Sequence, residues 1–275
     1  MALTIMTNTA SLSAQRNLAS TQKALAGNVA RLSSGMRINQ AADDAAGLGI
    51  SEKMKAQIGS LEQAGRNAND GISMIQVAEG AMNEQAGILT RLRELATQSA
   101  NGTLGATERG FIGTEKTQLL SELDRISAVT DFNGVKMLGG NSGSVSFQVG
   151  TGATGNDSIG VTFDKTDSAT LGVSGLDLST ASGAQSALAT IDTAIDKLST
   201  SRANIGAVQN RLNVTVTNLA TAHENIAAAN SRIRDVDVAT ETADLTRNQI
   251  LSQAGIAVLA QANQIPSMAL SLLRG

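Results

Sequence analysis

Residues 191–233, IDTAIDKLSTSRANIGAVQNRLNVTVTNLATAHENIAAANSRI, carry the most regular pattern in the chain. An aliphatic side chain recurs every seven residues without interruption, at Ile191, Leu198, Ile205, Leu212, Leu219, Ile226 and Ile233. Further apolar side chains support the same face, at Ile195, Val208, Val216 and Ala222. Such a repeat places its members along one seam of an α-helix, and a seam of this length requires other helices beside it. The segment therefore predicts one long helix in a coiled-coil bundle.

Three segments before it show the same repeat, so we expect helices there as well. The N-terminal arm has Leu18, Leu25 and Leu32 seven apart, and Ser33-Ser34-Gly35 then ends the pattern. A second helix is expected from about residue 47 to about residue 99, with a seam at Met54, Leu61, Ala68, Ile75, Met82 and Leu89. A shorter third helix is expected around Ile112, Leu119, Leu123 and Ile126.

Between Gly139 and Thr180 the composition changes to Gly, Ser, Thr and Asp, and the apolar period changes from seven to two. The alternating residues lie on either side of the turn-rich GTGATGNDS, at Val145, Phe147 and Val149 and at Ile159, Val161 and Phe163. Alternation on both sides of such a turn is typical of a β-hairpin. The predicted fold class is therefore mainly α: a long helical coiled-coil bundle with a small β-hairpin region at about 139–180, and with the chain ends paired in a helical domain.

The stretch LSQAGIAVLAQANQIPSMALSLL, residues 251–273, contains no charged side chain. Leu251, Val258, Ile265 and Leu272 fall seven apart and predict a terminal helix. We expect it to begin after residues 234–244, where the apolar repeat is missing. The run is long enough to span a bilayer, but its Gln, Asn and Ser side chains would have to be desolvated in lipid. We therefore expect protein to cover this helix. The N-terminal seam would be its first partner, and other copies of the chain would cover the remaining apolar surface.

The two ends of the chain resemble each other in charge and differ from the middle. Residues 1–42 and 245–275 together carry six basic side chains and no acidic one, so the net charge of −3 leaves −9 for the middle. This likeness predicts that the ends form one structural unit. The opening residues lack the features of a secretory signal, whereas the acid-free first 37 residues leave an organellar transit peptide as a minority alternative.

The composition offers little for catalysis or cofactor binding. There is no Cys, and the single histidine, His223, begins an HExxH pattern that Ala227 leaves incomplete, so a zinc site cannot form there. We expect His223 to be a partly exposed helix-packing residue. GTGATGN lacks the Lys and the strand-to-helix setting of a phosphate-binding loop. Asp43-Asp44 precede a helix, whose N-terminus favours carboxylates. The alternative that they act as an acid–base pair is left open, although the sequence shows no further catalytic residue to act with them. We predict no enzyme activity, metal or cofactor.

Nucleic-acid binding is also disfavoured. Arg16, Lys23 and Arg31 flank the N-terminal seam as charges flank a coiled coil, and the arm has no aromatic side chain on which bases could stack. Apolar seams at both ends, without a sufficient partner inside one chain, predict burial between chains, and contacts that do not close into a ring give a filament. The residues alone indicate a self-assembling helical protein, with an assembly seam at Leu18, Leu25, Leu32, Leu251, Val258, Ile265 and Leu272.

Four long motifs closely resemble bacterial flagellin, in the order expected of that family. They are LASTQKALAGNVARLSSGMRINQAADDAAGLGISEKM, LTRLRELATQSANGT, DRISAVTDFNGVKML and SRIRDVDVATETADLTRNQILSQAGIAVLAQANQIPSMALSLL. The resemblance covers essentially the whole chain. Only the region around 139–185 is available for the outer domains that large flagellins insert. The resemblance therefore implies a short, core-only flagellin.

What this resemblance implies can be stated as expectations. Residues 1–45 and 235–275 would form an inner helical domain and residues 46–234 an outer rod domain with the hairpin, with linkers near 33–46 and 234–244. The chain would be secreted unfolded by type III export and would polymerise into the extracellular flagellar filament for motility. Its partners would be further copies of itself, the flagellar cap, junction proteins and an export chaperone. The runner-up function is a hook-filament junction protein, which shares the terminal motifs.

The resemblance also implies a contact with the animal innate immune receptor for flagellin. In many flagellins this receptor contacts an Arg and a Leu on the second long helix and a Glu on the next. The matching residues are Arg91, Leu95 and Glu115. Arg91 and Leu95 are four apart, which puts them on one helix face. We expect the monomer to stimulate the receptor and the intact filament to do so weakly.

Overall fold

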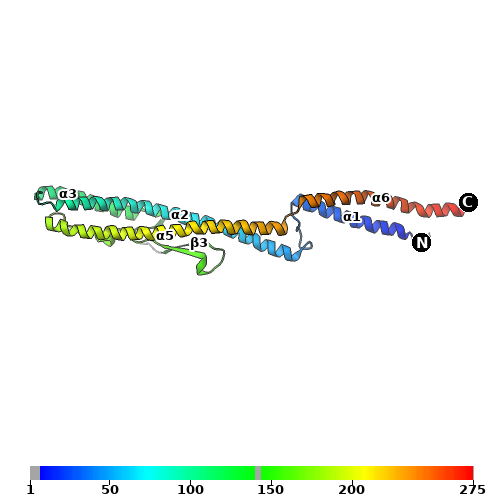
Figure 1. Cartoon of the computed structure of the whole chain (residues 1–275), viewed down its shortest axis with the longest axis horizontal. Coiled ribbons are helices and arrows are strands. Elements are labelled where there is room, and N and C mark those ends of the chain that lie inside the picture. Colours follow the sequence, from blue (N-terminus) through cyan, green and yellow to red (C-terminus); the bar gives the residue numbers. More distant parts are fainter. Residues whose placement is uncertain (1–6, 140–143, 275) are drawn as a thin grey trace. The chain divides into compact units, whose positions relative to one another are not determined.

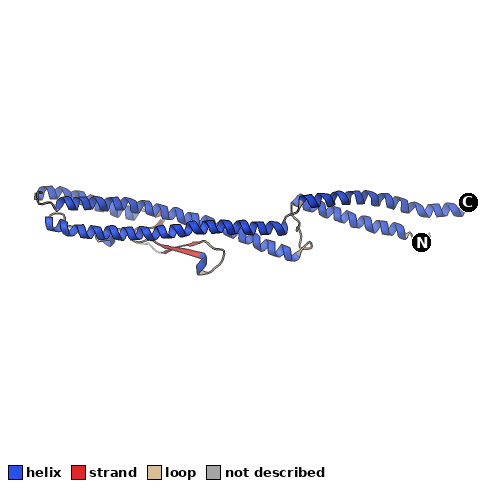
Figure 2. Cartoon of the chain, in the orientation of Figure 1, coloured by secondary structure: helices blue, strands red, loops and turns tan. Residues whose placement is uncertain are grey.

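The computed structural model describes residues 7–139 and 144–274, the residues after Gln264 by their backbone alone. Helices predominate among them (Figure 2). The chain divides into two compact units, one combining Met1–Ala56 with Asn225–Gly275 and the other comprising Gln57–Glu224. The division falls inside the long helices α2 (Ala45–Ser99) and α5 (Ala181–Arg234), not in the linkers near 33–46 and 234–244. The assignment of residues 1–45 and 235–275 to an inner domain and 46–234 to an outer domain stays a prediction.

In the first unit the terminal helices form an antiparallel pair. Helices α1 (Thr9–Ser34) and α6 (Val238–Arg274) lie side by side (Figure 1). Near one end of the pair, Asn8 Nδ2 donates a hydrogen bond of 2.8 Å to the carbonyl of Ala262. Near the other end, Arg31 Nη1 lies 3.4 Å from Glu241 Oε1. The two ends of the chain therefore belong to one unit, as their shared charge character indicates.

Helix α1 ends where its sequence pattern ends. The Asn8 side chain caps its start by accepting a hydrogen bond of 3.0 Å from the Ser11 N–H. Gly35 follows its last residue with φ of 70°, a left-handed conformation that glycine adopts without steric cost. Beyond it, Arg37 N–H donates to the carbonyl of Arg234 at 2.7 Å and Val236 N–H to that of Gly35 at 3.0 Å. Backbone bonds thus fasten the chain after α1 to the chain after α5.

Helix α6 begins earlier than the apolar pattern suggests. The expected linker at 234–244 is wrong in its second half, because α6 starts at Val238. The Asp237 carboxylate accepts hydrogen bonds from the Thr240 hydroxyl at 2.8 Å and the Ala239 N–H at 3.0 Å, which lower the pKa of Asp237. Such a cap starts a helix without any apolar seam. Within the described residues, no helix, α6 included, is long and apolar enough to cross a membrane.

The second unit is built on α2, α3 (Ala106–Val129) and α5. Helices α2 and α5 run antiparallel, since Arg93 lies 2.6 Å from Asp192 while Glu62 lies 3.2 Å from His223. The predicted seams supply the core: Ala68, Ile75, Met82 and Leu89 from α2, Ile112 and Leu123 from α3, and Ile191, Leu198, Ile205 and Leu212 from α5 are buried. The prediction of a long helical bundle is confirmed.

The hairpin is also confirmed. Strands β3 (Ser144–Gln148) and β4 (Ser158–Thr162) pair antiparallel with Val145 opposite Val161 and Phe147 opposite Ile159. Between them lies the 3₁₀ turn η1 (Gly155–Asp157). The hairpin packs on α2, where Asn67 Nδ2 donates to the carbonyl of Gln148 at 2.9 Å. Val161, and Phe163 beyond the strand, are buried in the core.

Three short elements do not appear in the apolar pattern. Strands β1 (Asp131–Phe132) and β2 (Val135–Lys136) form a second hairpin, and α4 (Ser168–Leu171) follows β4. Asn133-Gly134 between β1 and β2 is a strong hairpin signal in its own right. Helix α4 begins with hydrogen bonds to two carboxylates: its N-cap Asp167 Oδ1 accepts from the Thr170 N–H at 3.0 Å, and Asp124 Oδ1 on α3 accepts from the Ser168 N–H at 2.7 Å.

Two helical glycines of α2 should respond differently to alanine. At Gly80 an added Cβ would meet no neighbour, so Gly80→Ala should raise the free energy of unfolding by about 1 kcal/mol through helix propensity. At Gly71 the Cβ would lie 3.1 Å from ring atoms of Phe147, which must move, so Gly71→Ala should lose part or all of that gain. Urea unfolding of the monomers measures both. Equal gains at the two sites would contradict the packing of the hairpin on Gly71.

Candidate self-assembly surface

One row of residues on the face of α6 that meets α1 is small or polar. Its members fall seven apart, at Glu241, Asn248, Gly255 and Ala262. Asn248 Nδ2 donates to Asn28 Oδ1 at 3.3 Å, and a Cβ on Gly255 would lie 3.3 Å from Leu18. Together with the contacts of Glu241 and Ala262, these form a heptad seam that lets the helices approach closely. Leu245 and Leu259 of α6 are half-buried as well, so the pair combines these polar and close contacts with partial burial of leucine side chains.

The predicted assembly residues divide between two environments. Leu18, Leu25 and Leu32 of α1 are half-buried. Leu251 and Val258 of α6 are 49% and 58% exposed, because the seam that meets α1 lies on a neighbouring face of α6. The expectation that the N-terminal seam is the first partner of the C-terminal one is therefore wrong for Leu251 and Val258. The side chains of Ile265 and Leu272 lie outside the described residues.

Large apolar side chains are instead exposed on the outside of the α1–α6 pair. We call this set the outer apolar surface: Leu12 and Val29 on α1, and Val238, Ile250, Leu251, Ile256 and Val258 on α6. Single exposed aliphatic residues are ordinary on proteins, but seven on one helix pair make that pair a candidate for contacts with another protein. The neighbouring basic residues Arg16 and Lys23 are exposed, as expected of charges that flank a packing face.

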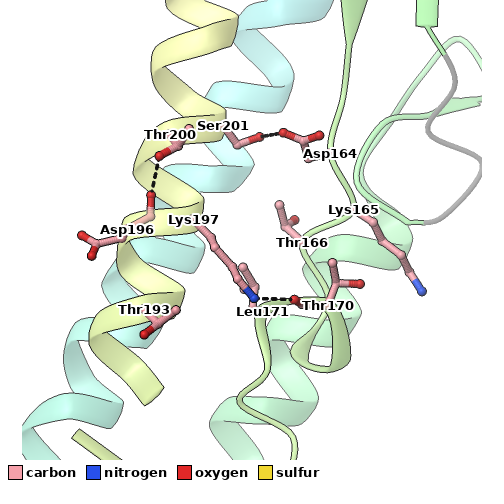
Figure 3. Close-up of a pocket in the computed structure, with 10 residues that line it drawn as sticks. All are labelled: Asp164, Lys165, Thr166, Thr170, Leu171, Thr193, Asp196, Lys197, Thr200 and Ser201. Carbon is pink, nitrogen blue, oxygen red and sulfur yellow. Dashed lines mark hydrogen bonds between the residues drawn. The ribbon is translucent and has the colours of Figure 1, made fainter. Parts of the chain in front are cut away.

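A groove lies in the second unit. It has a volume of about 560 Å³ and is lined by residues of α5 and of the segment 164–171 (Figure 3). Two pairs of its polar groups are hydrogen-bonded: Ser201 Oγ donates to Asp164 Oδ2 at 2.7 Å, and Lys197 Nζ donates to the carbonyl of Thr170 at 3.2 Å. The buried Thr166 Oγ1 in the lining has no hydrogen-bond partner among the described residues. Over the described chain, no group of three or more His, Cys, Asp or Glu side chains could hold a metal ion.

The acidic pair and the histidine considered for catalysis have structural roles. Asp43 Oδ2 accepts hydrogen bonds from the backbone N–H groups of Gln40 and Asn39, which lower the pKa of Asp43. Asp44 Oδ1 accepts from the Gly47 N–H at 2.8 Å, in the first turn of α2. His223 is half-buried and contacts Glu62 across the α2–α5 pair, which confirms a helix-packing role.

Charged groups elsewhere are stabilised in their charged form. A hydrogen bond from Arg93 lowers the pKa of Asp192, and one from Arg125 lowers that of Glu122. Seven carboxyl groups in the described part of the chain have a pKa below its ordinary value, and all seven are therefore stabilised as carboxylates. A carboxyl group that serves as an acid near neutral pH needs the opposite shift.

Two family models match the chain. The model of the bacterial flagellin N-terminal helical region covers residues 5–143, and that of the C-terminal helical region covers residues 188–273. The chain belongs to the bacterial flagellin family. The segment between the two matched regions contains the β3–β4 hairpin and α4, so this flagellin is a short, core-only form.

Similar proteins agree with this assignment over nearly their whole length. The flagellar filament 33 kDa core protein of Treponema phagedenis is 45% identical over 97% of this chain and 98% of its own. A flagellin of Halalkalibacterium halodurans is 47% identical over 94% of this chain and 93% of its own. Among solved structures, the flagellin of Bacillus cereus matches with a TM-score of 0.51 and 30% identity, over 60% of this chain and 94% of that one.

The flagellin places its three expected receptor residues in different environments. Arg91 Nε on α2 lies 2.8 Å from Glu115 Oε1 on α3, and hydrogen bonds to Glu115 and Glu94 raise the pKa of Arg91. Both Arg91 and Glu115 are exposed. Leu95 is only 1% exposed and belongs to the core. The expectation of one surface patch formed by all three side chains must therefore be corrected, because Leu95 packs inside the bundle of this chain.

The α1–α6 seam follows the predicted repeat of Leu18, Leu25 and Leu32 on α1 but not the predicted Leu251 and Val258 on α6. Its members on α6 are polar or small, so a search for apolar repeats passes over them. Gly255, between the exposed apolar Leu251 and Val258, was the available signal, because a helical glycine often marks the close approach of another helix.

Proposed function

We propose that this flagellin polymerises by burying its outer apolar surface against neighbouring copies. The chain is a structural subunit of the extracellular flagellar filament. The observation that carries the proposal is the exposure of Leu251, Val258 and the other residues of the outer apolar surface on the α1–α6 pair.

The energetics favour copies of the chain as the cover. Fully burying a Val, Leu or Ile side chain contributes roughly 1.5–3 kcal/mol, so several such residues per copy contribute several kcal/mol to a contact between subunits. A surface that binds a different surface of the next copy generates an open helical array and not a closed ring. Neighbouring subunits then stabilise each terminal helix pair, and the pair in turn presents the contacts for the next subunit.

Purified protein added to sheared filament fragments tests this function. We expect continuous elongation into long filaments, followed by electron microscopy and by sedimentation of the polymer. A hook-filament junction protein would bind the fragments but stop after a limited layer. Binding without elongation would therefore favour the junction protein over the filament subunit.

The proposed role includes no reaction. The paired groups of the groove and the structural roles of Asp43, Asp44 and His223 support a subunit that acts by assembly alone. We further propose the flagellar cap, junction proteins and an export chaperone as partners, on the basis of the flagellin family. Exposed aliphatic residues on the terminal helices support a need for such partners before assembly, since apolar surfaces of this kind associate nonspecifically in water.

We also propose recognition by the animal receptor for flagellin, with direct contacts from Arg91 and Glu115. Arg91→Ala and Glu115→Ala should each reduce receptor activation in a reporter-cell assay without changing the helicity of the monomer. Leu95→Ala should act through folding, with a loss of about 2–5 kcal/mol in the free energy of unfolding. Leu92→Ala, at an equally buried position on α2, is the matched control.

Two outcomes would contradict this account. If Leu95→Ala abolishes activation while Leu92→Ala, at equal loss of stability, does not, Leu95 contacts the receptor directly. If stabilised filaments activate the receptor as strongly as the monomer, the site is not covered by assembly.

A further inference from the structure

Asn133 and Gly134 form the two-residue loop between β1 and β2. The flanking strands pair Asp131 with Lys136 and Phe132 with Val135. The φ angles of the loop are 51° at Asn133 and 81° at Gly134, which match a type I′ turn. Asn133 is the only residue other than glycine, among those that the structure describes, with a positive φ angle. Both loop residues are exposed to solvent.

The side chain of Asn133 is free to react. In the described part of the chain its carboxamide takes part in no hydrogen bond, whereas Asn101, in the other Asn-Gly pair, accepts one from the Thr103 N–H at 3.3 Å. The Gly134 N–H donates to the Asp131 carboxylate at 3.2 Å and not to the strand ladder. Loss of the Gly134 proton breaks this hydrogen bond to the carboxylate but no bond of the strand ladder, and glycine has no side chain to shield its nitrogen.

We propose that Asn133 is a site of spontaneous deamidation. Hydroxide removes the proton of the Gly134 amide nitrogen, which then attacks Cγ of Asn133 and forms a carbon–nitrogen bond. The side-chain amide nitrogen leaves as ammonia after taking a proton from water, and a five-membered succinimide remains. Water opens this ring at either carbonyl and gives aspartate or isoaspartate. The net change consumes one water and releases one ammonia, with no oxidation or reduction.

The two products have different consequences for the fold. Aspartate tolerates a left-handed conformation nearly as well as asparagine, so the turn can persist. Isoaspartate adds a backbone atom to the loop and cannot keep the pairing of Phe132 with Val135. A hairpin of two residue pairs opens easily by itself. The next residues, Met137 and Leu138, are fully buried, so isoaspartate should loosen their anchorage in the core.

The full-length chain can be tested by incubation at 37 °C at neutral and at alkaline pH. Peptide mass spectrometry and an enzymatic assay for isoaspartate should show both products at residue 133, with a rate that rises with hydroxide concentration. The replacement Asn133→Asp should release no ammonia from this peptide. Circular dichroism confirms that the starting protein is folded. A urea-unfolded sample gives the rate for an unprotected Asn-Gly pair.

The comparison with Asn101 and with the unfolded chain decides the result. Faster conversion of Asn133 than of Asn101 in the folded protein supports the proposal. An Asn133 that stays intact in the folded chain while the unfolded chain converts would overturn it, because the type I′ turn would then protect the site. Conversion of Asn101 alone would overturn it as well.

Discussion

Val258→Asp should abolish polymerisation and leave the monomer folded. Val258 is 58% exposed on the outer apolar surface, so an aspartate there is solvated in the isolated chain. In the filament that we propose, the same carboxylate would be buried between copies without a partner, at a cost of several kcal/mol for every subunit. Because this cost recurs at every step of elongation, no filament should form. Seeded elongation and far-UV circular dichroism of the monomer are the two measurements.

Val258→Leu is the matched control for this experiment. It keeps an apolar side chain at the same position and should support elongation. Normal filaments from the Val258→Asp protein would show that this face of α6 stays in solvent after assembly. A Val258→Asp monomer with reduced helicity would show instead that Val258 supports the α1–α6 pair.

Phe163→Ala should give the largest loss of stability in the second unit. Phe163 follows β4 and is 1% exposed. It is the largest of the fully buried side chains that the structure describes. Phe163 belongs to the hydrophobic core cluster, and the chain contains no Trp or Tyr and only four Phe, so its ring is one of few bulky side chains available to fill that core. The free energy of unfolding should fall by about 3–5 kcal/mol, from lost burial and the cavity that remains. Urea unfolding of the monomer measures the change.

Phe111 provides the control, because it is the same residue type at a 71% exposed position on α3. Phe111→Ala should change the free energy of unfolding by no more than about 0.5 kcal/mol. Similar losses for Phe111→Ala and Phe163→Ala would contradict the arrangement of the core beneath the hairpin. If Phe111→Ala prevents polymerisation but leaves the free energy of unfolding unchanged, Phe111 lies in a contact between subunits.

The bundle could be predicted from the sequence because its core obeys a simple repeat. Ile191 to Leu212 on α5 and Ala68 to Leu89 on α2 are apolar, seven apart and buried, so local pattern and tertiary packing agree. The hairpin was predictable for the same reason, since Val145 and Phe147 alternate as a half-buried strand requires. Where burial alone decides the structure, hydrophobic periodicity is sufficient.

The elements that escaped prediction depend on polar groups. The start of α6 depends on the Asp237 cap, α4 on Asp124 and Asp167, and the α1–α6 seam on Asn28, Asn248 and Gly255. An apolar pattern cannot show these, because their contribution lies in hydrogen bonds and close backbone approach. The same limit applies to Leu95, whose spacing from Arg91 suggested one exposed face although the core side of α2 includes it.

The hydrogen bond from Asn8 to Ala262 joins residues 254 positions apart. Contacts of such long sequence separation form late, because the entropy of closing the intervening chain is lost before they contribute. During synthesis α1 is made before the second unit and α6 after it, so α1 must wait for its partner until the second unit has been made. The second unit can collapse on its own while this N-terminal segment waits. We expect the terminal pair to close after the bundle, so the order of folding opposes the order of synthesis.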